Sequence, residues 1–258
     1  MSWDKPLLPS AFLVSPIAHR GLHDRADGRP ENSTEAFRAA VDHGYGIELD
    51  LQLTSDGKAL AFHDYDLTRL TGAPGFVRSR TSHEMRALPL IGGASGAPLL
   101  EEVLEIVQGR VPLLIELKDQ DGALGDNIGE LEAATVKALD SYLGPTAVMS
   151  FNPNAVAALQ SLAPDIPRGL VTEDFDPVDW KVGASRAADL STIAEYDKVG
   201  ASFISHNREH LSMPRVAELK ATGAAILSWT IRSPEEEAKA RRVAENVTFE
   251  GYLPVFSS

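Results

Sequence analysis

The feature of this chain that most constrains its fold is a regular alternation of short apolar runs with segments of helical periodicity. Apolar runs of roughly four to eight residues suit buried strands, whereas apolar residues repeating every three to four positions suit helices. Nine runs are predicted to be strands: 16–19, 46–53, 60–63, 112–118, 146–151, 168–172, 202–206, 225–230 and 246–252.

The helical segments between most of these runs carry start signals as well as periodicity. The first is predicted to open at 32–35, where Asn-Ser-Thr-Glu places capping residues and an acid ahead of an apolar segment. Further helices are predicted at 99–108, 127–142, 153–162, 214–222 and 234–245. The last three begin at Pro153, Pro214 and Pro234, and proline is favoured in a first helical turn.

Roughly eight strand–helix units result, which favours a parallel sheet covered by helices. In a chain of 258 residues this pattern matches an α/β fold of the (β/α)₈ TIM-barrel type, formed as a single domain over 1–258. An open doubly wound sheet is the alternative, but no glycine-rich phosphate-binding fingerprint follows the first strand. The stretch 64–98 breaks the rhythm and is predicted to be a long insertion after the second strand.

Three carboxylates stand within these apolar strands. Glu48 and Asp50 are two positions apart, so both side chains point to the same face of their strand. Two like charges so close require a cation or a shared proton. Glu116 lies in the next barrel strand, where burying an unpaired charge is costly. Such an all-oxygen site favours one divalent cation, Mg²⁺ or Ca²⁺, over zinc, while a structural ion-pair network with Lys118 is the open alternative.

Histidines and basic residues stand at the same strand ends, where barrel enzymes carry their chemistry. His19 and Arg20 follow the first strand, His63 ends the run at 60–63, and Lys118 lies two residues beyond Glu116. A histidine exchanges protons near neutral pH, and an arginine grips phosphate in a bidentate way. Taken alone, His19 is better read as a packed or surface residue. Taken together, these groups supply an acid, a base and phosphate contacts for attack on a phosphodiester.

Later strand ends add weaker candidates. Phe151 and Trp229 close two strands and are expected to face the substrate, with core packing as the equal alternative. His206 and Glu250 also follow strands and are lesser candidates. The remaining histidines are assigned to loops or helix surfaces: His23, His43, His83 and His210.

Composition limits the partners and the location. With 24 basic and 37 acidic residues the net charge is −13, which argues against a nucleic-acid partner and against stable docking on an anionic membrane. The absence of cysteine excludes disulfides and thiol chemistry. Residues 1–15 lack the features of a signal peptide, and no apolar stretch approaches the ~20 residues of a membrane span, so a cytoplasmic location is expected. Whether the chain forms a homo-oligomer stays open.

In these residues and in the motifs around them, the chain resembles the glycerophosphodiester phosphodiesterase family. The first 70 residues carry the most specific motifs in order: Ile-Ala-His-Arg-Gly at 17–21, Pro-Glu-Asn-Ser at 30–33, Glu-Leu-Asp at 48–50, Thr-Ser-Asp-Gly at 54–57 and His-Asp at 63–64. Ile-Glu-Leu-Lys at 115–118, Ser-Phe at 150–151 and Trp-Thr at 229–230 are similar to later family motifs.

The resemblance implies a (β/α)₈ barrel that uses a divalent cation to hydrolyse small-molecule glycerophosphodiesters to glycerol phosphate and an alcohol. It implies that His19 and His63 form the acid–base pair, that Glu48, Asp50 and Glu116 hold the metal, and that Arg20 and Lys118 contact the phosphate. It also implies attack by the neighbouring glycerol hydroxyl, through a cyclic phosphate that water then opens.

The chain departs from the family pattern at two places. Arg232 stands where many members have asparagine, and 247–251 reads Val-Thr-Phe-Glu-Gly instead of the usual ending. Both bear on the leaving group. The alternatives are a lipid phosphodiesterase or lyase that stops at a cyclic phosphate, a non-catalytic barrel that binds a phosphate metabolite, and, more distantly, a glycosidase.

Overall fold

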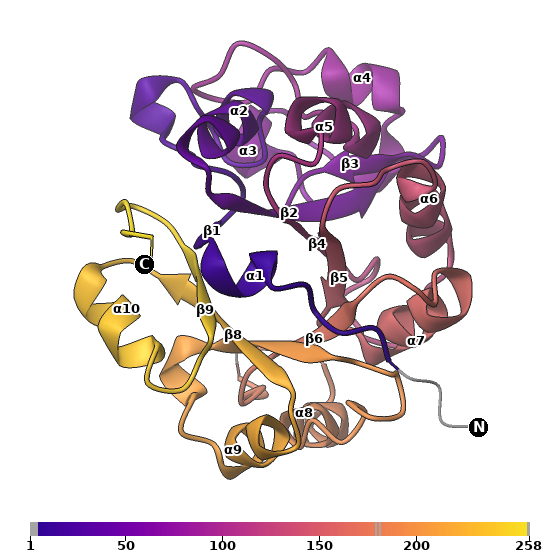
Figure 1. The fold of residues 1–258 in the computed structure, drawn as a ribbon. Coiled ribbons are helices and arrows are strands. Elements are labelled where there is room, and N and C mark those ends of the chain that lie inside the picture. The colour runs from indigo at the N-terminus through magenta and orange to yellow at the C-terminus, as the bar shows by residue number, and fades with distance from the viewer. Residues whose placement is uncertain (1–4, 179, 181, 257–258) are drawn as a thin grey trace.

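In the structure, a computed structural model that describes residues 5–178, 180 and 182–256, the strands close into a barrel (Figure 1). The closing strand β1 (Ile17–Ala18) pairs in parallel with both β2 (Gly46–Leu53) and β9 (Asn246–Phe249). The other parallel strands follow in chain order: β4 (Leu113–Leu117), β5 (Thr146–Ser150), β6 (Arg168–Thr172), β7 (Phe203–Asn207) and β8 (Ala225–Ile231). The closure confirms the predicted TIM barrel and excludes the open sheet.

Helices surround this ring of strands (Figure 1). They are α2 (Thr34–His43), α5 (Leu100–Val107), α6 (Glu130–Leu139), α7 (Pro153–Leu162), α8 (Ala184–Ser191), α9 (Pro214–Ala221) and α10 (Pro234–Ala240). As predicted, α7, α9 and α10 have proline in the first turn. The first of the predicted helices, α2, starts after Ser33, whose side chain accepts a hydrogen bond from the Ala36 amide. Among these seven helices, α8 had no counterpart among the predicted helices.

The period of two along β2 separates the outer core from the barrel interior. Ile47, Leu49 and Leu51 belong to the large cluster packed between strands and helices. The side chains between them face inward. At the N-terminal end of the strands the interior is apolar, and Phe12 of the short helix α1 (Ala11–Val14) packs there (Figure 1). Asn246 holds α1 in place by donating to the carbonyls of Phe12 at 2.7 Å and Ser15 at 2.6 Å.

We expect Phe12→Ala to lower the free energy of unfolding by about 3–5 kcal/mol, because it leaves a cavity at the closed end of the barrel. The Phe12 side chain is 0% exposed. Val14→Ala, on the same short helix but 54% exposed, is the matched control and should change the stability by no more than ~0.5 kcal/mol. Urea denaturation measures both effects. Equal effects would contradict the assignment of Phe12 as the residue that fills the closed end of the barrel.

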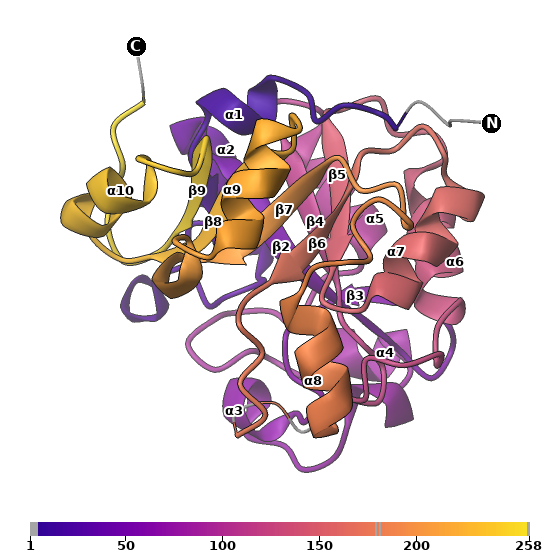
Figure 2. The same ribbon diagram turned by 90° about the horizontal axis from the view of Figure 1, so that it is seen from below.

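The predicted insertion at 64–98 is a folded segment. The run predicted as the strand 60–63 forms β3 (Ala59–Ala61), which pairs antiparallel with β2 and is not a barrel strand. After it come α3 (Thr68–Thr71), the 3₁₀ turn η2 (Val77–Ser79) and α4 (Ser82–Arg86). These share a small core of their own: Leu60, Phe62, Leu67, Leu70, Val77, Met85, Leu90 and Ala97. In Figure 2, α3 and α4 lie at the opposite end of the barrel from α1.

Two further 3₁₀ turns follow barrel strands, η1 (Arg25–Asp27) after β1 and η3 (Arg208–His210) after β7. Within 5–178, 180 and 182–256, no helix has the length and apolar character needed to cross a bilayer.

Candidate active site

A cavity of about 790 Å³ opens at the carboxyl ends of the strands, the end opposite α1. All the predicted site residues line it: His19, Arg20, Glu48, Asp50, His63, Glu116, Lys118, Phe151 and Trp229. They come from β1, β2, β4, β5, β8 and the chain just after β3, so residues distant in sequence meet at one place. The position agrees with where barrel enzymes carry their active sites.

The three carboxylates form a compact buried cluster. Glu48, Asp50 and Glu116 each offer an oxygen, and these oxygens lie within 4.8 Å of one another. Parallel pairing of β2 with β4 sets Asp50 directly beside Glu116. Burial, and then the charges of Asp50 and Glu116, raise the pKa of Glu48 well above its ordinary value of 4.5. The cluster therefore holds more negative charge than it can carry without a positive partner.

Lys118 supplies part of that positive charge. Its ammonium lies 2.7 Å from Asp50 Oδ1 and 2.5 Å from Glu116 Oε1. Although burial opposes ionisation, Lys118, with His63 and Arg20, holds the pKa of Asp50 well below its usual range. The donor set is oxygen only, and Lys118 brings one positive charge to a cluster of three carboxylates. These residues therefore fit a hard divalent cation.

Arg20 and its neighbours hold Asp50 in place. Arg20 Nε lies 3.1 Å from Asp50 Oδ2, and its Nη1 donates to Glu31 at 2.6 Å. Asn32 donates to Asp50 Oδ2 at 2.9 Å. The backbone turns sharply here: Arg20 has φ 56°, and at Gly21, φ 80°, a Cβ would lie 2.9 Å from Ala36. This turn brings the Arg20 amide 3.0 Å from Glu48 Oε2.

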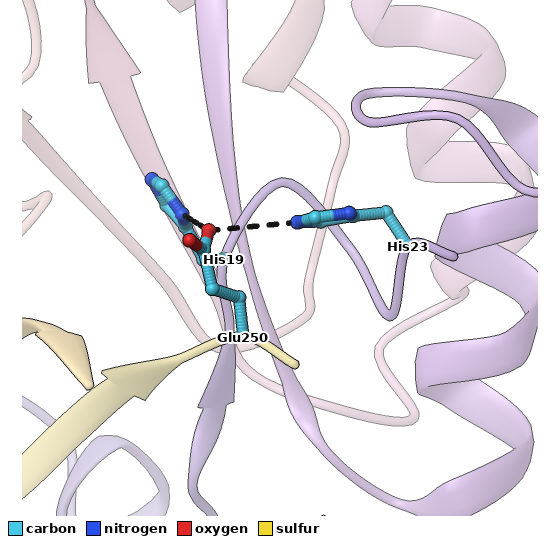
Figure 3. Close-up of side chains that lie close together, drawn as sticks. All are labelled: His19, His23 and Glu250. Carbon is cyan, nitrogen blue, oxygen red and sulfur yellow. Dashed lines mark hydrogen bonds and ion pairs between the residues drawn. The ribbon is translucent and has the colours of Figure 1, made fainter. Parts of the chain in front are cut away.

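His19 is held through its Nδ1 atom. That nitrogen lies 2.6 Å from Glu250 Oε2 (Figure 3). Because an ionised carboxylate only accepts hydrogen bonds, Nδ1 carries the proton and Nε2 is left for proton exchange. Arg232 fixes the other carboxylate oxygen, with Nε and Nη2 each 2.8 Å from Glu250 Oε1. Burial lowers the pKa of His19 despite the hydrogen bond to Glu250.

His63 is held in the same way by a different carboxylate. Its Nδ1 lies 2.7 Å from Asp64 Oδ1. Arg69 donates to Asp64 through Nε at 2.6 Å and Nη2 at 2.8 Å, and it also binds both oxygens of Glu31. Burial acts to raise the pKa of Asp64, but the hydrogen bonds from His63 and Arg69 hold that pKa well below its usual range. Glu31 joins this network to Arg20, so both sides of the site share one set of ion pairs.

Aromatic side chains form part of the cavity wall. Phe151 packs against Trp180 with ring centroids 4.9 Å apart and against Trp229 at 5.6 Å. The Trp229 indole donates to the Ser205 carbonyl at 2.9 Å. Leu124, Met149 and other apolar residues line the same cavity. Phe151 and Trp229 therefore pack against each other and also line the cavity.

Comparisons with known proteins agree on one family. Residues 19–246 match the model of the glycerophosphoryl diester phosphodiesterase family. The chain belongs to this family. A glycerophosphodiester phosphodiesterase of Caldanaerobacter subterraneus is 33% identical over 230 residues, covering 85% of this chain and 86% of the relative.

Solved structures support the same fold. An Oleispira antarctica phosphodiesterase in complex with the product sn-glycerol-3-phosphate superposes with a TM-score of 0.76 at 24% identity, covering 93% of this chain and 94% of that one. A glycerophosphodiester phosphodiesterase of Parabacteroides distasonis gives a TM-score of 0.71 at 23% identity, with coverages of 90% and 91%. These structures show the fold, while the family match and the Caldanaerobacter relative show that the chain is an enzyme of the glycerophosphodiester phosphodiesterase type.

Several residues around the site of this phosphodiesterase were not predicted as partners of the histidines. Glu250 ranked as a lesser candidate, and His23 was assigned to a loop, yet both lie beside His19. Asp64 appeared only as a member of a motif, and Arg69 lies in the stretch 64–98 that was predicted to be an insertion. His206 is buried, bonded to Thr172 Oγ1 at 2.8 Å, and does not line the cavity. The position of Glu250 at the end of the last strand was the one signal available for it.

Proposed function

We propose that this enzyme hydrolyses glycerophosphodiesters to sn-glycerol 3-phosphate and an alcohol in a reaction that depends on a divalent cation. One observation carries the proposal: three buried carboxylates and two carboxylate-held histidines line a single cavity at the carboxyl end of the barrel. The glycerol phosphate complex of the Oleispira protein supports the assignment of the product class.

The cation would be held by Glu48, Asp50 and Glu116, and when bound it supplies positive charge that stabilises the charge developing on the phosphoryl oxygens. The same donor set suits Mg²⁺ or Ca²⁺. Lys118, which is 15% exposed at the cavity wall, and Arg20, which lies beside Asp50, would contact the phosphate.

His19 and His63 move the protons. One histidine takes the proton of the glycerol hydroxyl next to the diester, and that oxygen attacks phosphorus while the other histidine protonates the departing alcohol. In the second step a water gives its proton to the second histidine, and the first returns its proton to the glycerol oxygen as the cyclic phosphate opens. Each histidine therefore both accepts and donates a proton at Nε2.

The first test is a coupled assay for glycerol 3-phosphate. Purified protein is given glycerophosphocholine, glycerophosphoethanolamine and glycerophosphoglycerol with Mg²⁺, with Ca²⁺ or with EDTA. We expect release that requires the cation and stops with EDTA, because the three carboxylates repel one another without it. Equal release with EDTA would contradict the metal assignment, and no release from any substrate would contradict the proposed reaction.

The apolar wall favours a second candidate. Phe76, Leu124, Met149 and Trp180 line the cavity beside the aromatic pair and could pack against the acyl chain of a lipid substrate. A lipid diester that gives a cyclic phosphate is the corresponding reaction. Incubation with lysophosphatidylcholine, followed by phosphorus NMR of the product, distinguishes a cyclic phosphate from the hydrolysed acylglycerol phosphate.

A further inference from the structure

A second group of metal-ligating side chains shares His19 with the substrate cavity, but its other two members, His23 and Glu250, do not line that cavity. His19, His23 and Glu250 each offer one ligand atom, and these atoms lie within 4.8 Å of one another. Glu250 Oε2 is 2.6 Å from His19 Nδ1 and 3.6 Å from His23 Nε2. Figure 3 shows the two imidazole rings approaching this oxygen from different directions. His19 directly follows β1, His23 lies four residues later, and Glu250 directly follows β9.

His23 has no part in the proposed proton transfers, and its environment is unusual. Its Nε2 atom is buried and makes no hydrogen bond among the described residues. The Glu250 carboxylate oxygen lies 3.6 Å away, beyond hydrogen-bond distance, and a buried polar atom without a hydrogen bond costs free energy, so this arrangement needs a reason. His23 and Glu250 also line a separate cavity of about 590 Å³, which gives an ion a route to the cluster that avoids the substrate cavity.

The donor set differs in kind from the carboxylate site. Two imidazole nitrogens and one carboxylate oxygen are the ligands of a three-residue zinc site with a position open to water. The three carboxylates of the substrate cavity select hard cations instead. Arg232 binds Glu250 Oε1 through two nitrogens, each at 2.8 Å, which keeps Oε2 turned toward the histidines. Such support of a ligating carboxylate is typical of metal sites.

We propose that His19, His23 and Glu250 form a second metal site, selective for Zn²⁺, through which zinc inhibits the enzyme. The inhibitory part rests on the proposed function, in which His19 must accept a proton at Nε2. Zinc bound at Nδ1 takes the electron pair of that nitrogen, so the single proton of neutral His19 moves to Nε2. In this state Nε2 already carries a proton and cannot accept another, so the step in which His19 acts as a base is blocked.

The test measures zinc binding and activity separately, with Mg²⁺ in excess to occupy the carboxylate site. Isothermal titration of the full chain with Zn²⁺ should give one tight site per chain, and the same zinc concentration should inhibit hydrolysis. In His23→Gln we expect the zinc affinity to fall by about 10- to 100-fold or more, because one of three ligands is lost. The concentration of zinc that halves the activity should rise by the same factor. Basal activity without zinc should be unchanged.

His83→Gln is the matched control, since His83 is an exposed histidine on α4 outside this cluster, and its zinc response should equal that of the wild type. Zinc inhibition that is equally strong in His23→Gln would place the ion at the carboxylates and overturn the proposal. So would the absence of a tight zinc site in the titration. If the protein lacks diesterase activity altogether, the binding comparison of wild type with His23→Gln still decides the metal site by itself.

Discussion

Glu48→Gln is expected to abolish cation-dependent hydrolysis while the barrel remains folded. The substitution keeps the shape of the side chain, and the amide oxygen can still accept from the Arg20 amide, which lies 3.0 Å from Glu48 Oε2. It removes one of the three negative charges that surround the proposed cation position. Losing a ligand charge should weaken Mg²⁺ binding by at least the 10- to 100-fold typical of losing an outer-shell partner. Calorimetric titration with Mg²⁺ and the coupled assay measure the two effects.

Glu132→Gln provides the matched control. Glu132 is 3% exposed, as buried as Glu48 at 2%, but it caps the start of α6 away from the cavity. Its replacement should leave Mg²⁺ affinity and activity unchanged. Wild-type Mg²⁺ affinity in Glu48→Gln would show that Glu48 is not a ligand, and the metal site would then have to be reassigned.

The pH dependence of the unfolding free energy tests whether the buried Glu48 carboxyl contributes to stability through its raised pKa. In the metal-free protein the pKa of Glu48 is raised above the value of 4.5 it has when unfolded. The native state therefore binds more protons than the unfolded state at pH values above 4.5, and stability falls as the pH rises toward the folded pKa. Glutamine does not titrate, so this part of the decline should be absent from the variant. Urea denaturation in EDTA at several pH values measures it.

The sequence was sufficient to predict which three carboxylates lie in buried strands, because that prediction depends on local patterns. The period of two along β2 places Glu48 and Asp50 on one face, and the apolar run before Glu116 marks its strand as buried. What the sequence could not supply was register. The alignment of Asp50 with Glu116 follows from the hydrogen-bonded pairing of β2 with β4, which no local pattern specifies.

The partners of the histidines were harder to predict for the opposite reason. His19 and Glu250 are separated by 231 positions and meet only because β9 closes the barrel against β1. Arg69 reaches Asp64 and Glu31 only because the segment 64–98 folds over the end of the barrel. The helices of that segment have four and five residues, too short to show a periodic pattern, so the sequence suggested an irregular insertion. The helix α8 was not predicted for a similar reason, because its eight residues are mostly small or polar and show little apolar periodicity.

His19→Ala and His63→Ala are each expected to lower kcat by about 10²- to 10⁴-fold, the usual contribution of a positioned acid–base group. Substrate KM should change little, because the proposed phosphate contacts are Lys118 and Arg20. Single-turnover and steady-state assays with glycerophosphocholine measure the loss. His43→Ala, an exposed histidine on α2, is the control and should retain wild-type kcat.

A change of leaving group then separates the two roles. Burial lowers the pKa of His19 and therefore favours its neutral form. In this form Nδ1 carries the proton and donates a hydrogen bond to Glu250, while Nε2 is free to accept a proton. His19 should therefore act first as the base. A glycerol phosphodiester with a p-nitrophenol leaving group needs little protonation as it departs. It should therefore restore much of the lost rate of the first step in His63→Ala and little of it in His19→Ala, measured as the release of p-nitrophenolate. The reverse pattern would exchange the two roles, and wild-type kcat in both variants would contradict histidine acid–base catalysis at this site.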